Sequence, residues 1–335
     1  APEPIRLQGH EGMNSLFEYE LLLHTPDSLN LGASEAADFD LNAFIGKDIC
    51  CSVDLDGSGE VISGAKGPAM YGIGAGVREI NALITKAVMV REEGRHIEYA
   101  LTLRPWLYLT TLRVNCKIYQ NQTVIEILDE LLGDYPFPVQ KILFQAYPVR
   151  DYQTQLNETD FQFFERLCQE WGISYHFEHS DGKHRLVLSD AMGCYKPNPS
   201  EAYQEVEYHA PGWKIEAEYI HSFAPEHQLT SGRYATRDYD YTRPKADFNA
   251  GRRDPRPTGQ ANSEVYQWHD DQAGSHYAQP KAGIADGNDT REESRQLALL
   301  RMEALRTHGA RAKASGNLRG MVPGSTFKLR RHPRQ

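Results

Sequence analysis

The sequence predicts a mixed fold that is mainly β, in the α+β class. The first third of the chain is a series of segments in which apolar and polar residues alternate, as they do along half-buried strands. Two short helices with clear start signals follow in the middle of the chain, and a third comes near its end. The 335 residues are enough for about two or three domains.

Four strands are predicted before residue 110. The first lies at residues 15–24, where large apolar side chains occupy every second position. The others lie at residues 44–59, which end in an Asp-Gly turn, at 77–90 and at 96–106, with the turn REEG between the last two. The apolar side chains of the first strand are Phe17, Tyr19, Leu21 and Leu23. Short turns of this kind join antiparallel neighbours, so this part is predicted to be an antiparallel sheet.

A helix is predicted at residues 121–133. Thr123 and Glu126 have the spacing of a capping box, in which each side chain accepts a hydrogen bond from the other residue's backbone. Gly133 stands where a C-cap glycine is expected. The apolar stripe of this helix consists of Val124, Ile127, Leu128 and Leu131. This pattern is typical of an amphipathic helix that covers a core.

A second helix of the same design is predicted at residues 159–171. Thr159 and Gln162 can form its capping box, and Gly172 can end it. Its predicted apolar face consists of Phe161, Phe164, Cys168 and Trp171. Burial of three aromatic rings stabilises a fold by several kcal/mol, at about 25 cal/mol per Å² of apolar area. The helix is therefore expected to pack against whatever follows it.

A hairpin is predicted directly after this helix. Residues 173–179 alternate, with His176 on one face of the strand and His179 on the other. The sequence SDGK favours a tight turn, and residues 184–190 form the returning strand. Helix and hairpin together are expected to close on each other as a scaffold without chemistry of its own.

The last third is looser. Short strands and long loops are expected from residue 191 onward, followed by a third helix. Thr290 and Glu293 fit a capping box, and Gly309 is expected to end the helix. The predicted apolar face of this helix consists of Leu297, Leu300 and Ala304.

Three histidines near the hairpin raise the question of a metal site. His176, His179 and His184 are close in sequence, but a zinc ion needs ligands that converge on one point. The first two point to opposite faces of a strand. We therefore expect histidines that are exposed or at the hairpin edge, with no metal and no cofactor.

Three glutamates could in principle supply a carboxylate pair for glycoside cleavage. They are Glu165, Glu170 and Glu178. A pair of this kind depends on a separation of several ångströms, which the sequence does not give. The first two lie on a helix whose other side is apolar, so both are expected on its solvated face.

Other motifs are weak. Gly72, Gly74 and Gly76 lack the spacing and the strand-to-helix context of a dinucleotide loop and predict a flexible loop. There is no G-x-S-x-G and no H-E-x-x-H. The five cysteines form no C-x-x-C pair, which argues against a disulfide framework or a thiolate zinc site. The basic runs at 252–257 and 329–335 are interpreted as a solvated loop and a solvated tail.

Charge and hydropathy exclude two classes of partner. The formal net charge is −10, so neither nucleic acid nor stable insertion into an anionic membrane is expected. No apolar run approaches the roughly 20 residues that span a bilayer. The first residues do not have the pattern of a signal peptide, so synthesis in the cytoplasm is expected.

Several segments, taken in order, resemble one protein family. They are LQGHEGMNSLFEYELLL at 7–23, YALTLRPWLYLTTLRVNCKIYQNQTVIEILDELL at 99–132, LNETDFQFFERLCQEWGISYHFEH at 156–179, RDYDYTRP at 237–244 and VPGSTFKLRRHP at 322–333. This order resembles the valine-glycine repeat protein G (VgrG) family, the spike proteins of type VI secretion. The resemblance covers nearly the whole chain, from residue 7 to residue 333. The glycine-rich stretch at 64–76 and the cysteine in the second helix are less typical of the family.

The resemblance implies a fold like the hub of a contractile-phage baseplate, with two antiparallel β-barrel-like domains joined by α/β segments. It implies a first barrel at residues 1–110, an α+β segment at 111–215, a second barrel-like part with the C-terminal helix at 216–308, and a linker at 309–335 that leads toward a needle base. It also implies a homotrimer whose ring has approximate six-fold symmetry. Such a ring would sit on the hexameric Hcp tube.

The function that the resemblance implies is structural. The chain would be the hub of a cell-puncturing spike, secreted by the type VI apparatus toward target cells. A spike-tip protein and effectors would bind through a region beyond this chain. No residue is assigned a catalytic, cofactor-binding or metal-binding role. The alternatives are a spike-associated peptidoglycan hydrolase and a carbohydrate-binding module.

The tail carries one further expectation. Residues 325–329 have strand character, but the sequence offers them no obvious partner strand. An unpaired strand exposes backbone donors and acceptors. The tail is therefore expected to be poorly packed, and this chain to be a monomer or a weak trimer unless the downstream barrel and needle are restored.

Overall fold

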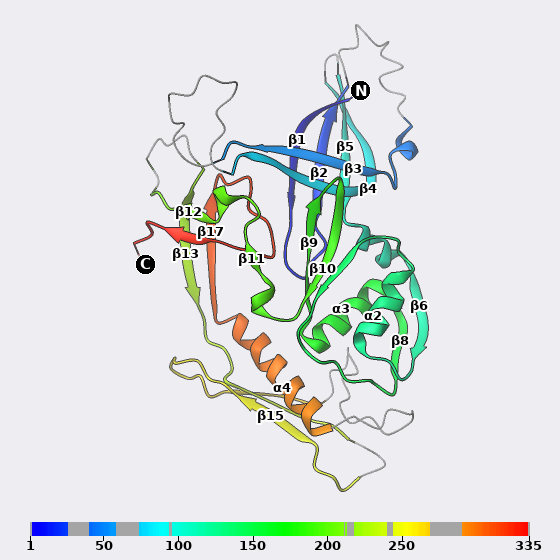
Figure 1. Ribbon diagram of the computed structural model, residues 1–335, viewed down its shortest axis with the longest axis vertical. Helices are drawn as coiled ribbons and strands as arrows, with labels where there is room; N and C mark the ends of the chain where they lie inside the picture. Colours follow the sequence, from blue (N-terminus) through cyan, green and yellow to red (C-terminus); the bar gives the residue numbers. More distant parts are fainter. Residues whose placement is uncertain are drawn as a thin grey trace.

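The computed structural model describes residues 2–25, 40–57, 74–93, 96–210, 212, 218–239, 244–268 and 290–333. The molecule is elongated, with a curled sheet at one end, two helices in the middle and a third helix with short strands at the other end (Figure 1). The described part is rich in strands and poor in helices, which confirms the mainly β prediction.

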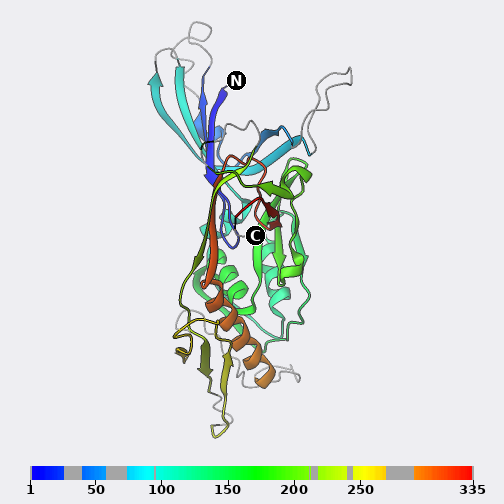
Figure 2. The ribbon, with the colours of Figure 1, turned by 90° about the vertical axis from the view of Figure 1, so that its left-hand side faces the viewer.

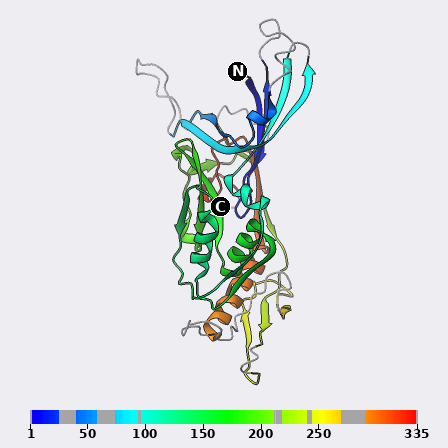
Figure 3. The ribbon, with the colours of Figure 1, turned by 90° about the vertical axis from the view of Figure 1, so that its right-hand side faces the viewer.

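The curled sheet contains the first five strands in the order β1-β2-β5-β4-β3, all antiparallel. Their bounds are β1 (Glu3–His10), β2 (Glu18–His24), β3 (Asp48–Leu55), β4 (Gly76–Glu93) and β5 (His96–Arg104), with the 3-10 turn η1 (Leu41–Ala43) before β3. The long strand β4 pairs with β3 up to Leu83 and with β5 from Leu83 onward. The half of β4 that pairs with β3 and the half that pairs with β5 therefore extend in different directions, and the sheet has the shape of half a barrel (Figures 2 and 3).

The alternation predicted for β2 is confirmed, because Phe17, Tyr19, Leu21 and Leu23 are all buried. Strand β1 was not predicted. Its residues are exposed except for a half-buried Leu7, so it has no apolar period to reveal it. It forms because its backbone pairs along the whole length of β2.

The middle of the chain holds the two predicted helices between small sheets. Its elements are η2 (Trp106–Leu112), β6 (Val114–Tyr119), α2 (Val124–Gly133), β7 (Val139–Ile142), β8 (Gln153–Thr159), α3 (Asp160–Trp171), β9 (Ser174–Ser180) and β10 (Lys183–Ser189). β6 pairs antiparallel with β8. β10 lies between an antiparallel β9 and a parallel β7.

The predicted helix starts are confirmed. In α2 the Glu126 backbone N–H donates to Thr123 Oγ1 at 3.2 Å, and the Thr123 N–H donates to the Glu126 carboxylate at 2.7 Å. In α3 the same exchange joins Thr159 and Gln162 at 3.0 and 2.8 Å. Both capping boxes are therefore complete.

The helix ends differ from each other. Gly172 has φ +67° and caps α3 in the left-handed conformation, as predicted. Gly133 does not, because it is the last helical residue of α2 and the cap is Asp134 in a right-handed conformation. The prediction of a left-handed glycine cap at Gly133 is therefore wrong.

The buried face of α3 is wider than the sequence indicated. Phe163 and Leu167 are fully buried as well, whereas Phe161 is only partly buried. Phe163 stacks on Tyr119 of β6 at 5.4 Å between ring centroids, and Phe164 meets Tyr175 of β9 edge-on at 5.2 Å. The helix has neighbours on two sides, so more than one stripe must be apolar. One continuous hydrophobic core runs from Phe17 to Leu188.

The last third is built from short pairs and one helix. Its elements are η3 (Met192–Cys194), β11 (Lys196–Pro197), η4 (Glu201–Tyr203), β12 (Glu205–Glu207), β13 (Ile220–His227), β14 (Arg233–Arg237), β15 (Asn249–Arg253), β16 (Glu264–Gln267), α4 (Thr290–Thr307), β17 (Ala310–Gly316), β18 (Ser325–Thr326) and β19 (Lys328–Arg330). β14 lies between β15 and β16, and β13 pairs with β17.

Helix α4 packs against the β14–β15 pair. Its buried apolar residues are Ala298 and Met302, which contact Tyr234. Leu297 and Leu300 are only partly buried and Ala304 is exposed, so the predicted single face is wrong. The reason is that α4 contacts two units, the small sheet on one side and the end of α3 on the other. The predicted capping box at Thr290 falls at the edge of the described residues.

The tail is paired, contrary to the expectation. β18 runs parallel to β11, and β19 runs parallel to β12. The Lys328 N–H donates to the Gln204 carbonyl at 2.8 Å, and the Asn198 amide donates to the Gly320 carbonyl at 2.9 Å. The partner strands β11 and β12 have only two and three residues, which is too short to leave a pattern in the sequence. The domain boundaries after residues 110, 215 and 308 stay predictions.

Candidate interaction surface

The three hairpin histidines are buried, so the expectation that they are exposed is wrong. The side chains of His176 and His179 are both 6% exposed, and His184 is 4% exposed. His179 faces Phe17 of the main core, whereas His176 lies on the other face of β9, against Gly324 of the tail. The two therefore point in opposite directions, as the strand period required.

Two of these histidines accept hydrogen bonds from the backbone of other elements. The Trp106 N–H donates to His184 Nε2 at 2.7 Å, and the Asn81 N–H donates to His179 Nδ1 at 3.0 Å. A ring nitrogen can accept only when it carries no proton. Burial lowers the pKa of His184 to about 3 and lowers the pKa of His179 and His176 as well. As neutral acceptors, His184 and His179 hold the sheet, η2 and the hairpin together.

The glutamates that could form a hydrolytic pair have separate partners. Glu165 accepts a 3.0 Å hydrogen bond from the Tyr175 hydroxyl, and burial raises the pKa of Glu165. Glu178 lies 3.7 Å from Arg185 on the neighbouring strand. Glu170 is buried, so the expectation that it lies on a solvated face is wrong.

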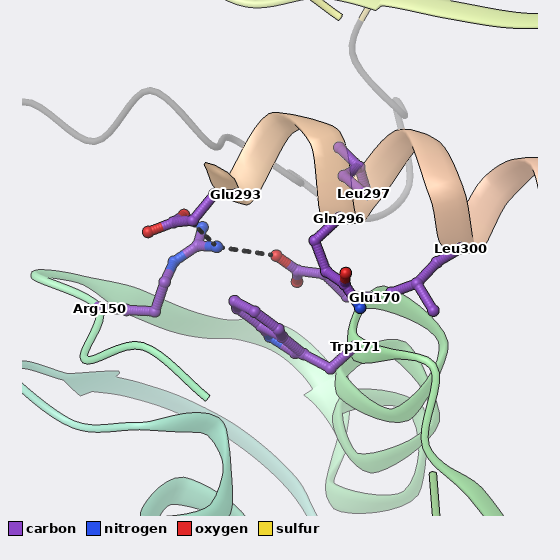
Figure 4. A pocket seen from close by; sticks show the side chains of 7 residues that line it. All are labelled: Arg150, Glu170, Trp171, Glu293, Gln296, Leu297 and Leu300. Carbon is purple, nitrogen blue, oxygen red and sulfur yellow. Dashed lines mark hydrogen bonds and ion pairs between the residues drawn. The ribbon is translucent and has the colours of Figure 1, made fainter. Parts of the chain in front are cut away.

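Glu170 belongs to a buried ionic cluster between α3 and α4 (Figure 4). An Arg150 Nη1 atom lies 3.3 Å from the Glu170 carboxylate and 3.6 Å from that of Glu293. The guanidinium also lies over the Trp171 ring, 5.4 Å from its centroid. Gln296, Leu297 and Leu300 complete the lining.

The cavity at this cluster is about 20 Å³. That is room for about one water molecule and far too little for a sugar ring. The cluster therefore joins α4 to the core and has no space for a substrate. Among the described residues, no group of three or more His, Cys, Asp or Glu side chains is arranged to hold a metal ion.

In the described part of the chain, the ribbon formed by β13 and β17 is largely exposed, although Phe223 of β13 packs against His332 of the tail, with 5.1 Å between ring centroids. All residues of β17 are exposed, and in β13 only Ile220 is buried. The register places Phe223, Pro225, Ala312 and Ala314 on one face. The other face is charged, with Glu226 3.1 Å from Lys313. Two-stranded ribbons are marginally stable alone.

The outer strands of the curled sheet are β1 and β3. β1 is exposed along nearly its whole length. Figure 1 shows the ribbon on one long side of the molecule, with β6 and β8 on the opposite side. Open strand edges and exposed ribbons are places where another chain can pair. β3 was predicted within residues 44–59, but β1, β13 and β17 carry no signal in the sequence, because strands exposed on both faces have no apolar period.

Within the described residues no helix is both long and apolar enough to cross a bilayer.

Comparisons with known proteins agree with the hub-like architecture. Residues 10–335 match the family described as phage tail baseplate hub (GPD). The type VI secretion system spike protein VgrG1b of Pseudomonas aeruginosa is 30% identical over 333 residues, which cover 98% of this chain and 39% of that protein. Spike protein VgrG1a of the same organism is 29% identical over 332 residues, which cover 98% of this chain and 45% of that protein.

The chain thus spans less than half the length of these relatives. Among solved structures, the E. coli c3393 protein superposes with a TM-score of 0.61 at 15% identity, over 99% of this chain and 65% of that protein. It is described as a component of the type VI secretion system with structural similarity to the T4 bacteriophage tail proteins gp27 and gp5. That likeness confirms the predicted hub-like fold. Since the family match spans nearly every residue, this chain belongs to the phage tail baseplate hub family, and its relatives are the VgrG spike proteins of type VI secretion.

Proposed function

We propose that this chain is the hub of a type VI secretion spike and acts as a structural subunit without catalysis. Three copies form a ring, and the ring sits on the hexameric Hcp tube. A spike-tip protein and effectors bind through the region beyond this chain and are carried toward target cells. The relatives named as spike proteins support this role.

The observation that carries the proposal is the largely exposed β13–β17 ribbon, whose apolar face is covered in part by His332 of the tail, at Phe223. One of its faces carries Phe223, Pro225 and small alanines, and both of its strands are exposed. A surface of this kind is stable when another copy covers it, because an added chain satisfies the free strand edges and buries the apolar face. In a three-fold ring, the curled sheet and the ribbon of each chain would provide six similar positions around the axis.

The test is the mass of the particle in solution, measured by sedimentation equilibrium on the chain and on the longer protein with its downstream region. We expect a trimer of the longer protein. Ala312→Asp places a charge on the apolar face of the ribbon and should weaken the trimer. Lys313→Ser lies on the other face of the same strand and serves as the matched control. Equal trimer stability in both variants would reject the ribbon as the contact.

Tube binding is tested separately, by co-sedimentation of the trimer with assembled Hcp tubes. A trimer that does not bind the tubes would contradict the hub role while leaving the ring intact. The hydrolase alternative is tested by peptidoglycan turnover. We expect none, and turnover that disappears in Glu165→Gln would overturn the structural role.

A further inference from the structure

A groove of about 820 Å³ lies between the beginning of β4, the end of β9 and the tail. Val77 and Glu79 line it from β4, Phe177 lines it from β9, and Gly324 lines it from the tail. It is separate from the ribbon and from the Arg150 cluster. Three parts of the chain that are distant in sequence therefore meet around one open space.

The side of β4 that faces the groove is an open strand edge. β4 pairs with β3 from Gly76 to Leu83 without a break, but with β5 only from Leu83 onward. The Asn81 N–H donates to His179 and therefore points away from β3. Backbone direction alternates along a strand, so Val77 and Glu79 also point their N–H and C=O groups away from β3. In the described chain no hydrogen bond uses those groups of Val77.

The side of β9 that faces away from β10 is also an open strand edge. The backbone N–H and C=O of Tyr175 both bond to Asn14, at 2.8 Å each, so they point away from β10. By the same alternation the backbone of Phe177 points away from β10 too. The ring of Phe177 is buried against Phe17, with 5.3 Å between centroids. Phe177 therefore lines the groove mainly with its backbone.

The walls also leave room for a backbone to approach. A Cβ atom added to Gly76 would meet no atom within 4 Å. Arg78 pairs with Glu11 at 3.0 Å and Arg185 with Glu178 at 3.7 Å. The other charged side chains that line the groove include Asp181, Lys196 and Glu201, so both signs of charge are present. The groove thus offers free peptide groups and no single sign of charge, which suits an uncharged main chain better than an ionic ligand.

We propose that the groove binds an extended peptide segment of a partner protein as an added strand along the Val77 edge of β4. Main-chain hydrogen bonds to Val77 supply the affinity, and β9 forms the second wall. Small uncharged side chains fit best, because Gly76 and Gly324 line the space. This partner is distinct from the neighbouring copies and the tube of the hub.

The test uses the intact chain and a display library of random seven-residue peptides. We expect enriched peptides with small uncharged residues at alternate positions. Gly76→Ile adds a branched side chain at a position whose Cβ meets no atom within 4 Å, and it should weaken binding of an enriched peptide at least about tenfold, or about 1.4 kcal/mol. Gly259→Ile is the matched control, because Gly259 also faces open space but lies between β15 and β16.

A second variant tests the backbone contact itself. Val77→Pro removes the backbone N–H that would donate to a carbonyl group of the peptide, so it should abolish binding. The melting temperature of this variant shows whether the fold survives. Three results would overturn the proposal. They are the absence of any enriched peptide, equal binding to Gly76→Ile and wild type, and a change in oligomer mass with Gly76→Ile, which would assign the groove to a second copy.

Discussion

The backbone N–H of Trp106 donates a 2.7 Å hydrogen bond to Nε2 of His184, 78 residues further along the chain. Trp106 is fully buried at the start of η2, and His184 lies on β10. The imidazole thereby satisfies the first backbone donor of the turn that leads from the curled sheet to the helices.

His184→Leu should destabilise the fold by about 1–3 kcal/mol, because the Trp106 N–H would be buried without an acceptor. Urea unfolding of the variant and the wild type measures the difference. His184→Gln retains an oxygen that can accept the bond and should cost less. A loss in His184→Gln as large as in His184→Leu would show that packing, and not the hydrogen bond, is responsible.

Acid should destabilise the protein through the same histidine. The pKa of His184 is about 3 in the fold, against an ordinary value of 6.5. Below pH 6.5 the unfolded chain therefore binds a proton that the native state does not. Stability falls as the pH drops from 6.5 toward 3, by up to about 1.4 kcal/mol per pH unit for this group.

His179 and His176 act in the same direction, because their pKa values are also lowered by burial. Unfolding free energies at pH 7, 6, 5 and 4 check the slope. His184→Gln has no proton to take up and should show a shallower fall below pH 6.5. An identical slope in that variant would exclude His184 as the titrating group.

Trp171→Ala should cost about 3–5 kcal/mol. Trp171 is 8% exposed. The Arg150 guanidinium lies over its ring, and Tyr147 contacts the ring edge-on. The melting temperature and the urea midpoint measure the change. Phe161→Ala on the partly buried side of the same helix is the control and should cost less. A melting temperature close to wild type in Trp171→Ala would contradict the packing of this end of α3.

Arg150→Met should destabilise by about 3–5 kcal/mol, because two buried carboxylates would lose a shared cation. Replacing the cluster together, as Arg150→Met with Glu170→Gln and Glu293→Gln, should recover most of that loss. Amide hydrogen exchange along α4 checks whether the helix detaches from the core. Equal stability of the single and triple variants would mean that the charges are not coupled.

Gly324→Ala should cost more than Gly46→Ala. Both glycines have positive φ, +72° and +76°, so both substitutions strain the backbone by about 1–2 kcal/mol. At Gly324 the new Cβ would also meet the His176 ring at 2.4 Å, whereas at Gly46 it meets nothing. Unfolding in urea gives the difference. Equal losses would show that the tail is not seated against His176.

The amino-acid sequence by itself determined the local elements. The capping boxes at Thr123 and Thr159, the left-handed cap at Gly172 and the alternation of β2 all depend on residues within a few positions of each other. The hairpin turn at Asp181 and Gly182 is of the same kind, with φ +54° and +70°. Short-range hydrogen bonds and side-chain periods encode such features, so they can be read without a structure.

The tertiary structure decided everything that depends on a distant partner. Glu170 is buried because Arg150 and α4 reach it, and the tail is paired because β11 and β12 lie beside it, more than a hundred residues earlier in the chain. β1, β13 and β17 are strands held by backbone pairing, which any side chain permits. Backbone hydrogen bonds between distant segments leave no pattern in either segment alone, and that is why the surface proposed for assembly could be found only in the fold.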